Sequence, residues 1–297
     1  MIPWKGVILA GGTGSRLAPL TAAVNKHLLP VFDKPLIYYP LSALMLADIR
    51  ETTIVTTPES LVQFETLLGD GSQWGLKLSY RVQSRPEGIA AGLRIVSDDL
   101  RGCNVALILG DNIFFGAGLA QTLETSKANN PGATIFAYEV ANPRAFGVVT
   151  LDAQRLPIAI EEKPTDPKSR LAVTGLYIYD ADVLEIASRV RPSQRDELEI
   201  TDVNRVYLQQ GRLRVRNLGR GVAWLDGGTP EDLYEAAQFV KVVQERTGLR
   251  VACPEEIAYR RGFIDRAAFA RLAELAPTSG YKAYLLRVLE DPLLGLH

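Results

Sequence analysis

The residues with the clearest chemical meaning form a glycine-rich segment near the N-terminus. Gly11, Gly12 and Gly14 directly follow a short apolar run. Clustered glycines let backbone N–H groups approach a phosphate, and the N-terminus of a following helix adds its positive dipole end. Two standard patterns fail, because a P-loop needs Gly-Lys-Ser/Thr where Arg16 and Leu17 stand, and a dinucleotide fingerprint starting at Gly12 needs glycine at position 17. The segment predicts a phosphate-binding loop of another kind, or a ligand-free turn between a strand and a helix.

Two aspartates each end an apolar run. Asp111 follows residues 104–110, and Asp226 follows residues 221–225. Ligands of open α/β sheets bind beyond the carboxyl ends of the strands. Two hard oxygen ligands together with substrate phosphates make a Mg²⁺ site. An aspartate after a strand is also a common helix cap or turn former, so the pair is a candidate site.

The cations near these positions suit anionic ligands. Arg16 lies within the glycine segment, and the arginine fork can bind phosphate oxygens in a bidentate way. Glu162 and Lys163 are adjacent in Glu-Glu-Lys-Pro, which fits either a ligand site or a solvated charge pair at the end of a strand.

The wider sequence around the glycine segment resembles the sugar-1-phosphate nucleotidylyltransferases. Their loop reads Gly-Gly-x-Gly-x-Arg-Leu-x-Pro-x-Thr and is followed by a lysine ahead of a Leu-Pro pair, as residues 11–21 and Lys26 to Pro30 do here. Further similar segments lie in order along most of the chain: LPVFDKPLIYYPLS, GDGSQWGL, ILGDN, EEKP, AVTGLYIYD, ELEITDVN, AWLD and VACPEEIAYR. Within the family the likeness is greatest to members that use dTTP and glucose 1-phosphate at the first step of dTDP-rhamnose synthesis.

The resemblance implies transfer of a nucleotidyl group to a sugar 1-phosphate, with release of pyrophosphate. The nucleophile is the phosphate oxygen of the sugar substrate, which attacks the α-phosphorus in line, so no protein nucleophile is needed. Cations and Mg²⁺ would stabilise the crowded anions.

The resemblance also assigns roles to individual residues. The charge-stabilising residues are Arg16 and Lys26 at the nucleotide phosphates, and Lys163 and Arg195 at the sugar phosphate. The nucleotide-binding residues are Leu9, Gly11, Gly12, Gly14, Gln83, Pro86 and Gly88. The sugar-binding residues are Asn112, Gly147, Glu162, Val173 and Trp224, and the metal ligands are Asp111 and Asp226. A regulatory nucleotide site between subunits would involve Phe115, Gly116, Ala252, Glu256, Ile257 and Arg260, which could equally be plain helix packing.

Several positions depart from the family pattern. His27 and Ala91 each replace a glutamine in the nucleotide region, while Phe146 replaces a tyrosine and Gly227 a threonine near the sugar. Lys282 replaces a glycine, and Leu119 replaces an aromatic residue that the regulatory site would use for stacking. Gln83 can pair with the imide edge of either thymine or uracil. The alternatives therefore include UTP as the donor, a modified sugar 1-phosphate as the acceptor, and a weakly catalytic paralogue that binds nucleotide-sugar and regulates a partner. The weakly catalytic paralogue is disfavoured because the chain retains the charged residues that the reaction would need, which are Arg16, Lys26, Asp111, Lys163 and Asp226.

Composition narrows the function classes. The 297 residues carry a net charge of −1, so a nucleic-acid partner is not expected. The apolar run 7–10 is too short for a signal segment or a membrane span. Only Cys103 and Cys253 are present, which favours a reducing cytoplasm. The resemblance further implies a homotetramer.

Strands and helices alternate in the first half. Apolar, β-branched runs predict strands at 5–10, 51–57, 76–83, 104–111 and 133–140, with helices at 37–49, 61–70 and 88–100 between them. This alternation predicts an α/β fold with a mostly parallel sheet covered by helices on both faces. The resemblance refines it to the Rossmann-like, three-layer nucleotide-diphospho-sugar transferase type.

The middle of the chain is richer in strands, and the C-terminus is helical. Strands at 146–152, 157–163, 173–180, 213–219 and 221–226 suggest antiparallel additions on or beside the main sheet. From Thr229 a helix is expected, with Pro230 at its first position and a C-cap at Gly248, and further helices at 265–275 and 280–289. We therefore expect a core at 1–228 that includes the sugar-binding part, and a helical region at 229–297 for regulatory or subunit contacts, with no linker between them.

Overall fold

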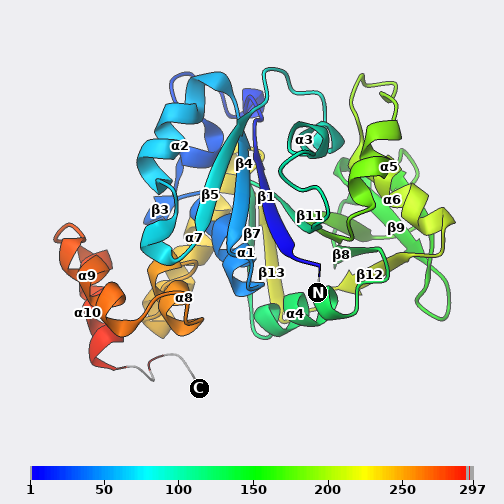
Figure 1. The fold of residues 1–297 in the computed structure, drawn as a ribbon. Helices are drawn as coiled ribbons and strands as arrows, with labels where there is room; N and C mark the ends of the chain where they lie inside the picture. Colours follow the sequence, from blue (N-terminus) through cyan, green and yellow to red (C-terminus); the bar gives the residue numbers. More distant parts are fainter. Residues whose placement is uncertain (1, 292–293, 295–297) are drawn as a thin grey trace.

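The computed structural model describes residues 2–291 and residue 294, and its centre is a nine-stranded sheet (Figure 1). The order is β10-β9-β11-β6-β1-β4-β5, and β8 also pairs with β11 and carries β12 at its other edge. The strands are β1 (Trp4–Ala10), β4 (Glu51–Thr56), β5 (Lys77–Val82), β6 (Asn104–Leu109), β8 (Ala133–Glu139), β9 (Gly147–Leu151), β10 (Pro157–Glu162), β11 (Leu171–Tyr179) and β12 (Leu213–Asn217). Two small sheets pair β2 (Pro30–Val31) with β3 (Lys34–Pro35) and β7 (Asn112–Gly116) with β13 (Val222–Asp226).

The sheet has a parallel half and a largely antiparallel half. Strands β6, β1, β4 and β5 are parallel neighbours, as the alternation of strands and helices predicts. Strands β9, β10 and β11 are the expected antiparallel additions. The expectation is wrong for β12, which runs parallel to β8, because the long connection between these two strands includes β9, β10 and β11 and does not impose the antiparallel direction of a tight hairpin.

Helices cover both faces of the sheet. The helices before the C-terminal region are α1 (Tyr38–Leu46), α2 (Leu61–Leu68), α3 (Ile89–Ile95), α4 (Leu119–Ala128), α5 (Val183–Arg189) and α6 (Ile200–Gln209). Alternate residues of β1 contribute to the two faces: Ile8 packs in the core with α1, α2 and α4, and Val7 packs in the core with α3, α5 and α6. The α/β fold with a sheet between helical layers is therefore confirmed.

The glycine segment leads into a single tight turn, and the helix expected after it is absent. The 3₁₀ turn η1 (Ser15–Leu17) follows Gly14 directly, and the first α-helix, α1, begins more than twenty residues later. Pro19 explains the stop, because a proline disfavours helical backbone in the residue before it, and Ala18 is extended. No helix dipole is therefore available at this loop, and any phosphate there would depend on backbone N–H groups and side-chain cations.

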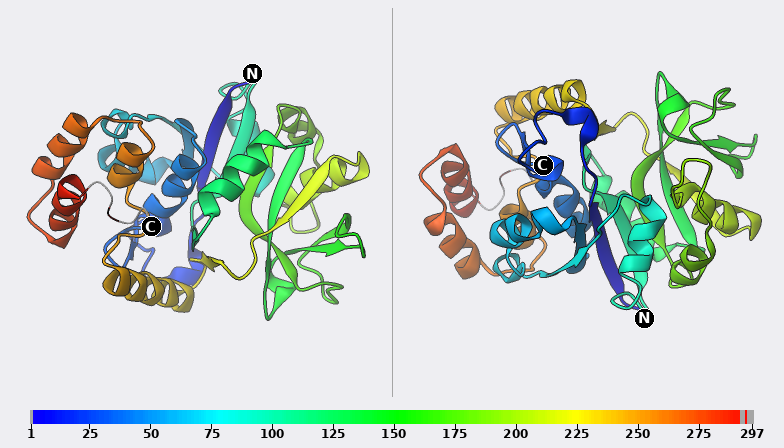
Figure 2. Two further views of the ribbon diagram at one scale, coloured as in Figure 1. Left: turned by 90° about the horizontal axis from the view of Figure 1, so that it is seen from below. Right: turned by 90° about the horizontal axis from the view of Figure 1, so that it is seen from above.

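The C-terminal helices pack at the side of the molecule away from β12 (Figure 2). They are α7 (Pro230–Thr247), α8 (Pro254–Arg260), α9 (Arg266–Leu275) and α10 (Gly280–Glu290). Thr229 caps α7 by accepting from the Asp232 N–H, and Gly248 ends it in the left-handed conformation, as expected. The sequence pattern also predicts α9 and α10, but α8 was not among the expected helices.

One apolar cluster joins α7 to the rest of the chain, and a second lies within the C-terminal region itself. Leu233, Ala236 and Val240 of α7 pack against Leu17 and Val31, beside the glycine loop. Phe269 and Leu285 of α9 and α10 form a cluster with Cys253. We keep the division at 228/229 as a proposal, and the final residues 292–293 and 295–297 lie outside the described part. In that part, no helix is long and apolar enough to cross a membrane, and both cysteines are buried and free.

Candidate active site

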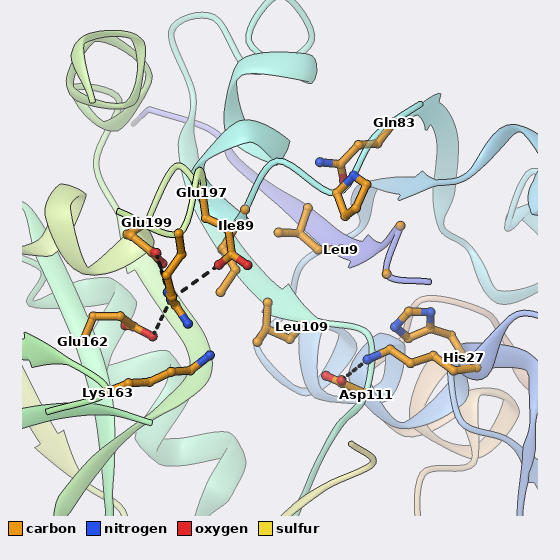
Figure 3. A pocket seen from close by; sticks show the side chains of 16 residues that line it. Leu9, His27, Gln83, Ile89, Leu109, Asp111, Glu162, Lys163, Glu197 and Glu199 are labelled. Carbon is orange, nitrogen blue, oxygen red and sulfur yellow. Dashed lines mark hydrogen bonds and ion pairs between the residues drawn. The ribbon is translucent and has the colours of Figure 1, made fainter. Parts of the chain in front are cut away.

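A cleft of about 270 Å³ opens where β1 and β6 end, between the parallel and antiparallel halves of the sheet (Figure 3). Leu9 and Leu109 stand between its two sides. One side carries Asp111 and His27, and the other carries Lys163 with Glu162, Glu197 and Glu199. The full lining is Leu9, Gly11, Gly12, Lys26, His27, Gln83, Pro86, Gly88, Ile89, Leu109, Asp111, Glu162, Lys163, Arg195, Glu197 and Glu199.

The glycine loop and Gln83 form one wall. A Cβ atom on Gly11 would lie 2.7 Å from Oε1 of Gln83, so a side chain at position 11 would displace that carboxamide. Gly14 has φ +62°, a conformation that favours glycine, and it lies outside the cleft lining. The wall therefore brings the backbone of Gly11 and Gly12 close to the only amide side chain of the lining, the group that could read a base edge.

Lys26 and Asp111 form an ion pair at the end of β6, and Asp226 is close to them. Burial alone would raise the pKa of Asp111, but the charge of Lys26 and the hydrogen bonds from Lys26 and Asn112 together lower that pKa. Burial and the charge of Asp111 raise the pKa of Asp226. Asp226 ends β13 of the small sheet and pairs in register with Asn112, which agrees with the expected antiparallel strand beside the main sheet.

The two carboxylates fit a divalent cation. Each carboxylate offers hard oxygen ligands. A bound divalent cation would also relieve the repulsion between Asp111 and Asp226 that helps to raise the pKa of Asp226. Among residues 2–291 and 294, no group of three or more His, Cys, Asp or Glu side chains could hold a metal ion. The remaining ligands of such an ion would therefore be substrate phosphates and water.

Arg16 approaches this pair from the glycine loop. A Cβ atom on Gly228 would lie 3.1 Å from Nη2 of Arg16 and 3.3 Å from Oδ2 of Asp226. The absence of a side chain at position 228 therefore lets the guanidinium approach the carboxylate. The Arg16 charge is exposed, and it forms no ion pair with any described carboxylate.

Asn112 links Asp111, a candidate metal ligand, by hydrogen bonds to β11 in the antiparallel half of the sheet. Its Nδ2 donates to Oδ1 of Asp111 at 3.0 Å, while its Oδ1 accepts from Trp224 Nε1 at 2.6 Å and from the Gly175 N–H at 3.0 Å. This hydrogen-bond network fixes the position of the Trp224 ring, which also makes an edge contact with Phe146.

Glu162, Gly147 and Val173 come together behind the cleft. Oε2 of Glu162 accepts from Thr201 Oγ1 at 2.5 Å. A Cβ atom on Gly147 would lie 3.3 Å from that same oxygen and 3.7 Å from Cβ of Val173. The three predicted sugar-binding residues are thus neighbours, and Thr201 is a fourth that the sequence analysis did not single out.

Lys163 and Arg195 supply the positive charge on this side. Lys163 adopts φ +44°, and its backbone N–H donates to the Phe146 carbonyl at 3.0 Å. No described carboxylate lies within ion-pair distance of its ammonium group, which leaves the charge available to a ligand. Arg195 is instead surrounded by Glu162, Glu197 and Glu199.

His27 is buried beneath the cleft and is uncharged near neutral pH. Burial and the neighbouring Lys26 charge lower its pKa to about 3. Its Nδ1 lies 2.7 Å from Oδ1 of Asn25. A Cβ atom on Gly110 would lie 2.6 Å from the imidazole ring, so His27 packs directly under the turn that carries Asp111.

Eleven of the predicted site residues line the cleft, and the others lie behind it or beside it. The predicted residues outside the lining are Gly14, Arg16, Asn112, Gly147, Val173, Trp224 and Asp226. Sequence reasoning did not single out Ile89, Leu109, Glu197 and Glu199, which line it. Both glutamates fall in the similar segment ELEITDVN, but nothing in the sequence shows that they meet Arg195.

The six residues predicted for a regulatory site line a second cavity, of about 600 Å³. It lies between β7, α4, α1 and α8, with Phe115 and Gly116 on one wall and Ala252 and Ile257 on another. Arg260 Nε donates to Glu256 Oε1 at 3.0 Å, and Tyr284 donates to the other oxygen of that carboxylate at 2.5 Å. Leu119 also lines this cavity, whereas Lys282 bonds within the α9–α10 pair.

The remaining departures lie in packed positions. Ala91 is buried in α3. A Cβ atom on Gly227 would lie 3.1 Å from Leu36, 3.2 Å from Leu233 and 3.3 Å from the Asp111 carbonyl oxygen. A threonine at 227 would therefore require repacking next to Asp111.

Comparisons with known proteins agree on one family. The sequence model described as nucleotidyl transferase matches residues 5–242. Glucose-1-phosphate thymidylyltransferases from Neisseria meningitidis and Mycobacterium tuberculosis are 52% and 50% identical to the chain, each over 286 residues, covering 96% of this chain and 99% of theirs.

Solved structures give the same result. A Bacillus anthracis structure, described as a glucose-1-phosphate thymidylyltransferase in complex with a sucrose, has a TM-score of 0.73 and 41% identity. The alignment covers 80% of this chain and 94% of that one. A UDP-glucose pyrophosphorylase complexed with UDP-glucose has a TM-score of 0.71 and 25% identity, with 82% and 100% covered.

Proposed function

The chain belongs to the nucleotidyl transferase family, and from its likeness to the glucose-1-phosphate thymidylyltransferases we propose how its cleft transfers the nucleotidyl group of dTTP to glucose 1-phosphate. One observation supports the assignment of the two substrates most strongly. The glycine loop with Lys26 and Asp111 lies on one side of the cleft, and Lys163 with Arg195 lies on the other (Figure 3). Two separate groups of cations can hold two phosphorylated substrates with their phosphates facing each other.

The donor lies against the glycine loop in this proposal. The backbone of Gly11 and Gly12 and the Gln83 amide line the same wall, with Pro86 and Gly88 beside them. Arg16 and Lys26 balance the charge at the α-phosphate and the departing pyrophosphate. The thymine imide edge would pair with Gln83, and the same edge on uracil keeps UTP as the competing donor.

The acceptor lies against the opposite side. Lys163 and Arg195 bind its phosphate, and Glu162, Gly147, Val173 and Trp224 contact the sugar. Orientation is the main contribution of these residues, because a phosphate oxygen of the acceptor must lie in line with the bond from the α-phosphorus to the leaving pyrophosphate. That oxygen forms the new bond to phosphorus, the bond to pyrophosphate breaks, and no group on the protein is modified.

A divalent cation is expected in this family, and we propose Mg²⁺ held by Asp111 and Asp226. When bound, it would polarise the α-phosphoryl group and neutralise charge on the phosphates. The chain's own contribution is to hold the two carboxylates together, through the Asn112–Asp226 pairing of β7 with β13 and the Asn112–Asp111 hydrogen bond.

The second cavity supports a regulatory site. We propose that it binds a dTDP-sugar, with Arg260 toward the diphosphate and Glu256 toward a ribose or base donor. Both side chains line it, one helical turn apart on α8. The homotetramer and the cytoplasmic location remain predictions, and light scattering after size exclusion would measure the subunit number.

Measuring pyrophosphate release for each donor and acceptor tests the substrate assignment. Purified enzyme with Mg²⁺ would be assayed with dTTP and UTP against glucose 1-phosphate and a panel of modified sugar 1-phosphates. The highest kcat/KM is expected for dTTP with glucose 1-phosphate. A higher value for UTP or for a modified sugar would assign the site to that substrate, and no release with any pair would overturn the proposal.

A further inference from the structure

Arg195 is the most heavily contacted cation of the cleft, and one partner dominates. Oε1 of Glu199 accepts from both Nε (3.2 Å) and Nη2 (2.8 Å) of Arg195. Glu162 and Glu197 lie at 3.3 Å and 3.4 Å from Nη2. Glu199 is therefore the only one of the three that engages two nitrogens of the guanidinium in the described structure.

Burial separates Glu199 further from the other two. Its side chain is 9% exposed, against 23% for Glu162 and 42% for Glu197. Ser193 Oγ also donates to Oε1 at 2.8 Å. A buried carboxylate is costly without a partner, whereas an exposed ion pair is screened by water. The contact with Glu199 is thus the one that can hold the guanidinium in a single orientation.

The backbone at Glu199 is fixed independently of its side chain. Leu198 donates its N–H to the Glu87 carbonyl at 2.7 Å, and its own carbonyl accepts from Ala90 at 3.0 Å. Glu199 is also the residue that precedes α6. Arg195 stands four residues earlier, in the exposed segment between α5 and α6. Glu199 therefore connects the partly exposed side chain of Arg195 to a backbone that is anchored on the wall formed by Pro86 and Gly88.

We propose that Glu199 is a positioning residue, which fixes Arg195 so that its free edge faces the phosphate of the sugar substrate. This inference depends on the proposed role of Arg195 as a ligand of that phosphate. Glu199 occupies Nε and Nη2, and no described residue accepts a hydrogen bond from Nη1. Holding the side chain in advance removes the conformational entropy that binding would otherwise cost.

Steady-state kinetics of Glu199→Gln test the idea. The KM for glucose 1-phosphate should rise roughly tenfold, since the amide keeps the shape but loses the charge that orients Arg195. The KM for dTTP should change by less than about twofold, because the anchored backbone is unaltered. Glu197→Gln is the matched comparison: it removes an equal charge beside the same guanidinium, but from an exposed site, and its effect should be several times smaller, on the order of twofold. Equal effects of the two variants would overturn the proposal.

The same change in an Arg195→Ala background separates positioning from a general structural role. There Glu199→Gln should leave the KM for glucose 1-phosphate unchanged, and it should raise the melting temperature, because it neutralises a buried carboxylate that has lost its partner. An additional rise in KM, or a lower melting temperature, would show that Glu199 acts without Arg195.

Failure of the underlying function gives a different result. If Arg195→Ala alone leaves the KM for glucose 1-phosphate unchanged, then Arg195 is not a phosphate ligand and the proposed acceptor site is wrong. If Arg195→Ala raises that KM and Glu199→Gln does not, the acceptor site stands and only the positioning role is lost.

Discussion

The catalytic cleft and the second cavity both contain arginines, but they differ in how many of those charges are already neutralised. In the cleft region, Lys26 and Arg195 are paired with carboxylates, but Lys163 in the lining and Arg16 beside it form no ion pair with a described carboxylate. In the second cavity, Arg250, Arg260 and Arg261 are each paired, with Asp33, Glu256 and Glu124 respectively. An anion entering the cleft meets unpaired positive charge, whereas an anion entering the cavity must compete with existing partners.

This difference in charge pairing suits the two different uses of a nucleotide that we propose for the cleft and the second cavity. Strong attraction suits the site that must gather two polyanions and stabilise charge during transfer. Weaker, competitive attraction suits a site that responds to the concentration of a product.

The largest effect is expected at the two metal-ligand candidates. Asp111→Asn and Asp226→Asn should each lower turnover at least about a hundredfold while the fold remains intact, because each removes a negative ligand at the reacting phosphates. Turnover as a function of Mg²⁺ concentration is the measurement. Asp98→Asn, in an exposed ion pair with Arg101, is the control and should remain near wild type. If Asp111→Asn or Asp226→Asn keeps near wild-type turnover at limiting Mg²⁺, the proposal that these two carboxylates hold the metal is wrong.

The two unpaired cations of the cleft region should affect different kinetic constants when they are replaced. Arg16→Ala should lower kcat by roughly a hundredfold, because its charge complements the α-phosphate during transfer. Lys163→Ala should chiefly raise the KM for glucose 1-phosphate, by about tenfold, since it binds a phosphate that is present throughout. Lys168→Ala, an exposed lysine five residues further on, should change neither constant. The reverse pattern would mean that the two phosphate pockets have been exchanged.

The second cavity should affect regulation alone. Inhibition by dTDP-rhamnose should be non-competitive in part, and Arg260→Ala should weaken it by about tenfold while uninhibited turnover is retained. Leu119, where the family has an aromatic residue, removes a stacking surface and should keep the inhibition modest. Arg271→Ala, exposed on α9, serves as the control. If inhibition is purely competitive and is the same in the Arg260→Ala enzyme, the second cavity is not a regulatory site and its helices serve only in packing.

The two regions also differ in how much of them could be predicted from the sequence. The cleft is built from glycines, from cations in short motifs and from residues that follow strands, and all of these can be recognised in the amino-acid sequence. The strand that carries Asp226 was predicted, but its pairing with β7 was not, because register depends on which strands meet in space. The helix expected after Gly14 was wrong because Pro19 interrupts it.

Contacts between distant side chains were the part that could not be predicted. Nothing in the spacing of Glu199 and Arg195 shows that the glutamate is buried and the arginine exposed, since that depends on how α6 packs. Helix α8 has seven residues, which is too short for a clear periodic pattern, and so the cavity it lines was expected only from the family resemblance.

The smallest effect on activity is expected at His27, whose burial at the cleft makes the stability of the fold sensitive to acid. The folded chain holds the pKa of His27 at about 3, against 6.5 for an ordinary histidine. Between these values the unfolded chain binds a proton that the folded chain excludes, so lowering the pH from 6.5 toward 3 destabilises the fold. His27 alone should contribute up to about 1.4 kcal/mol per pH unit to the slope of unfolding free energy against pH. His27→Gln should reduce that slope by this amount between pH 4 and 6 in urea titrations, because glutamine cannot take up the proton. It should leave the slope unchanged above pH 7, where both states of the wild-type residue are neutral. An unaltered slope at low pH would show that His27 is protonated in the folded chain as readily as in the unfolded chain, and that water reaches its side chain.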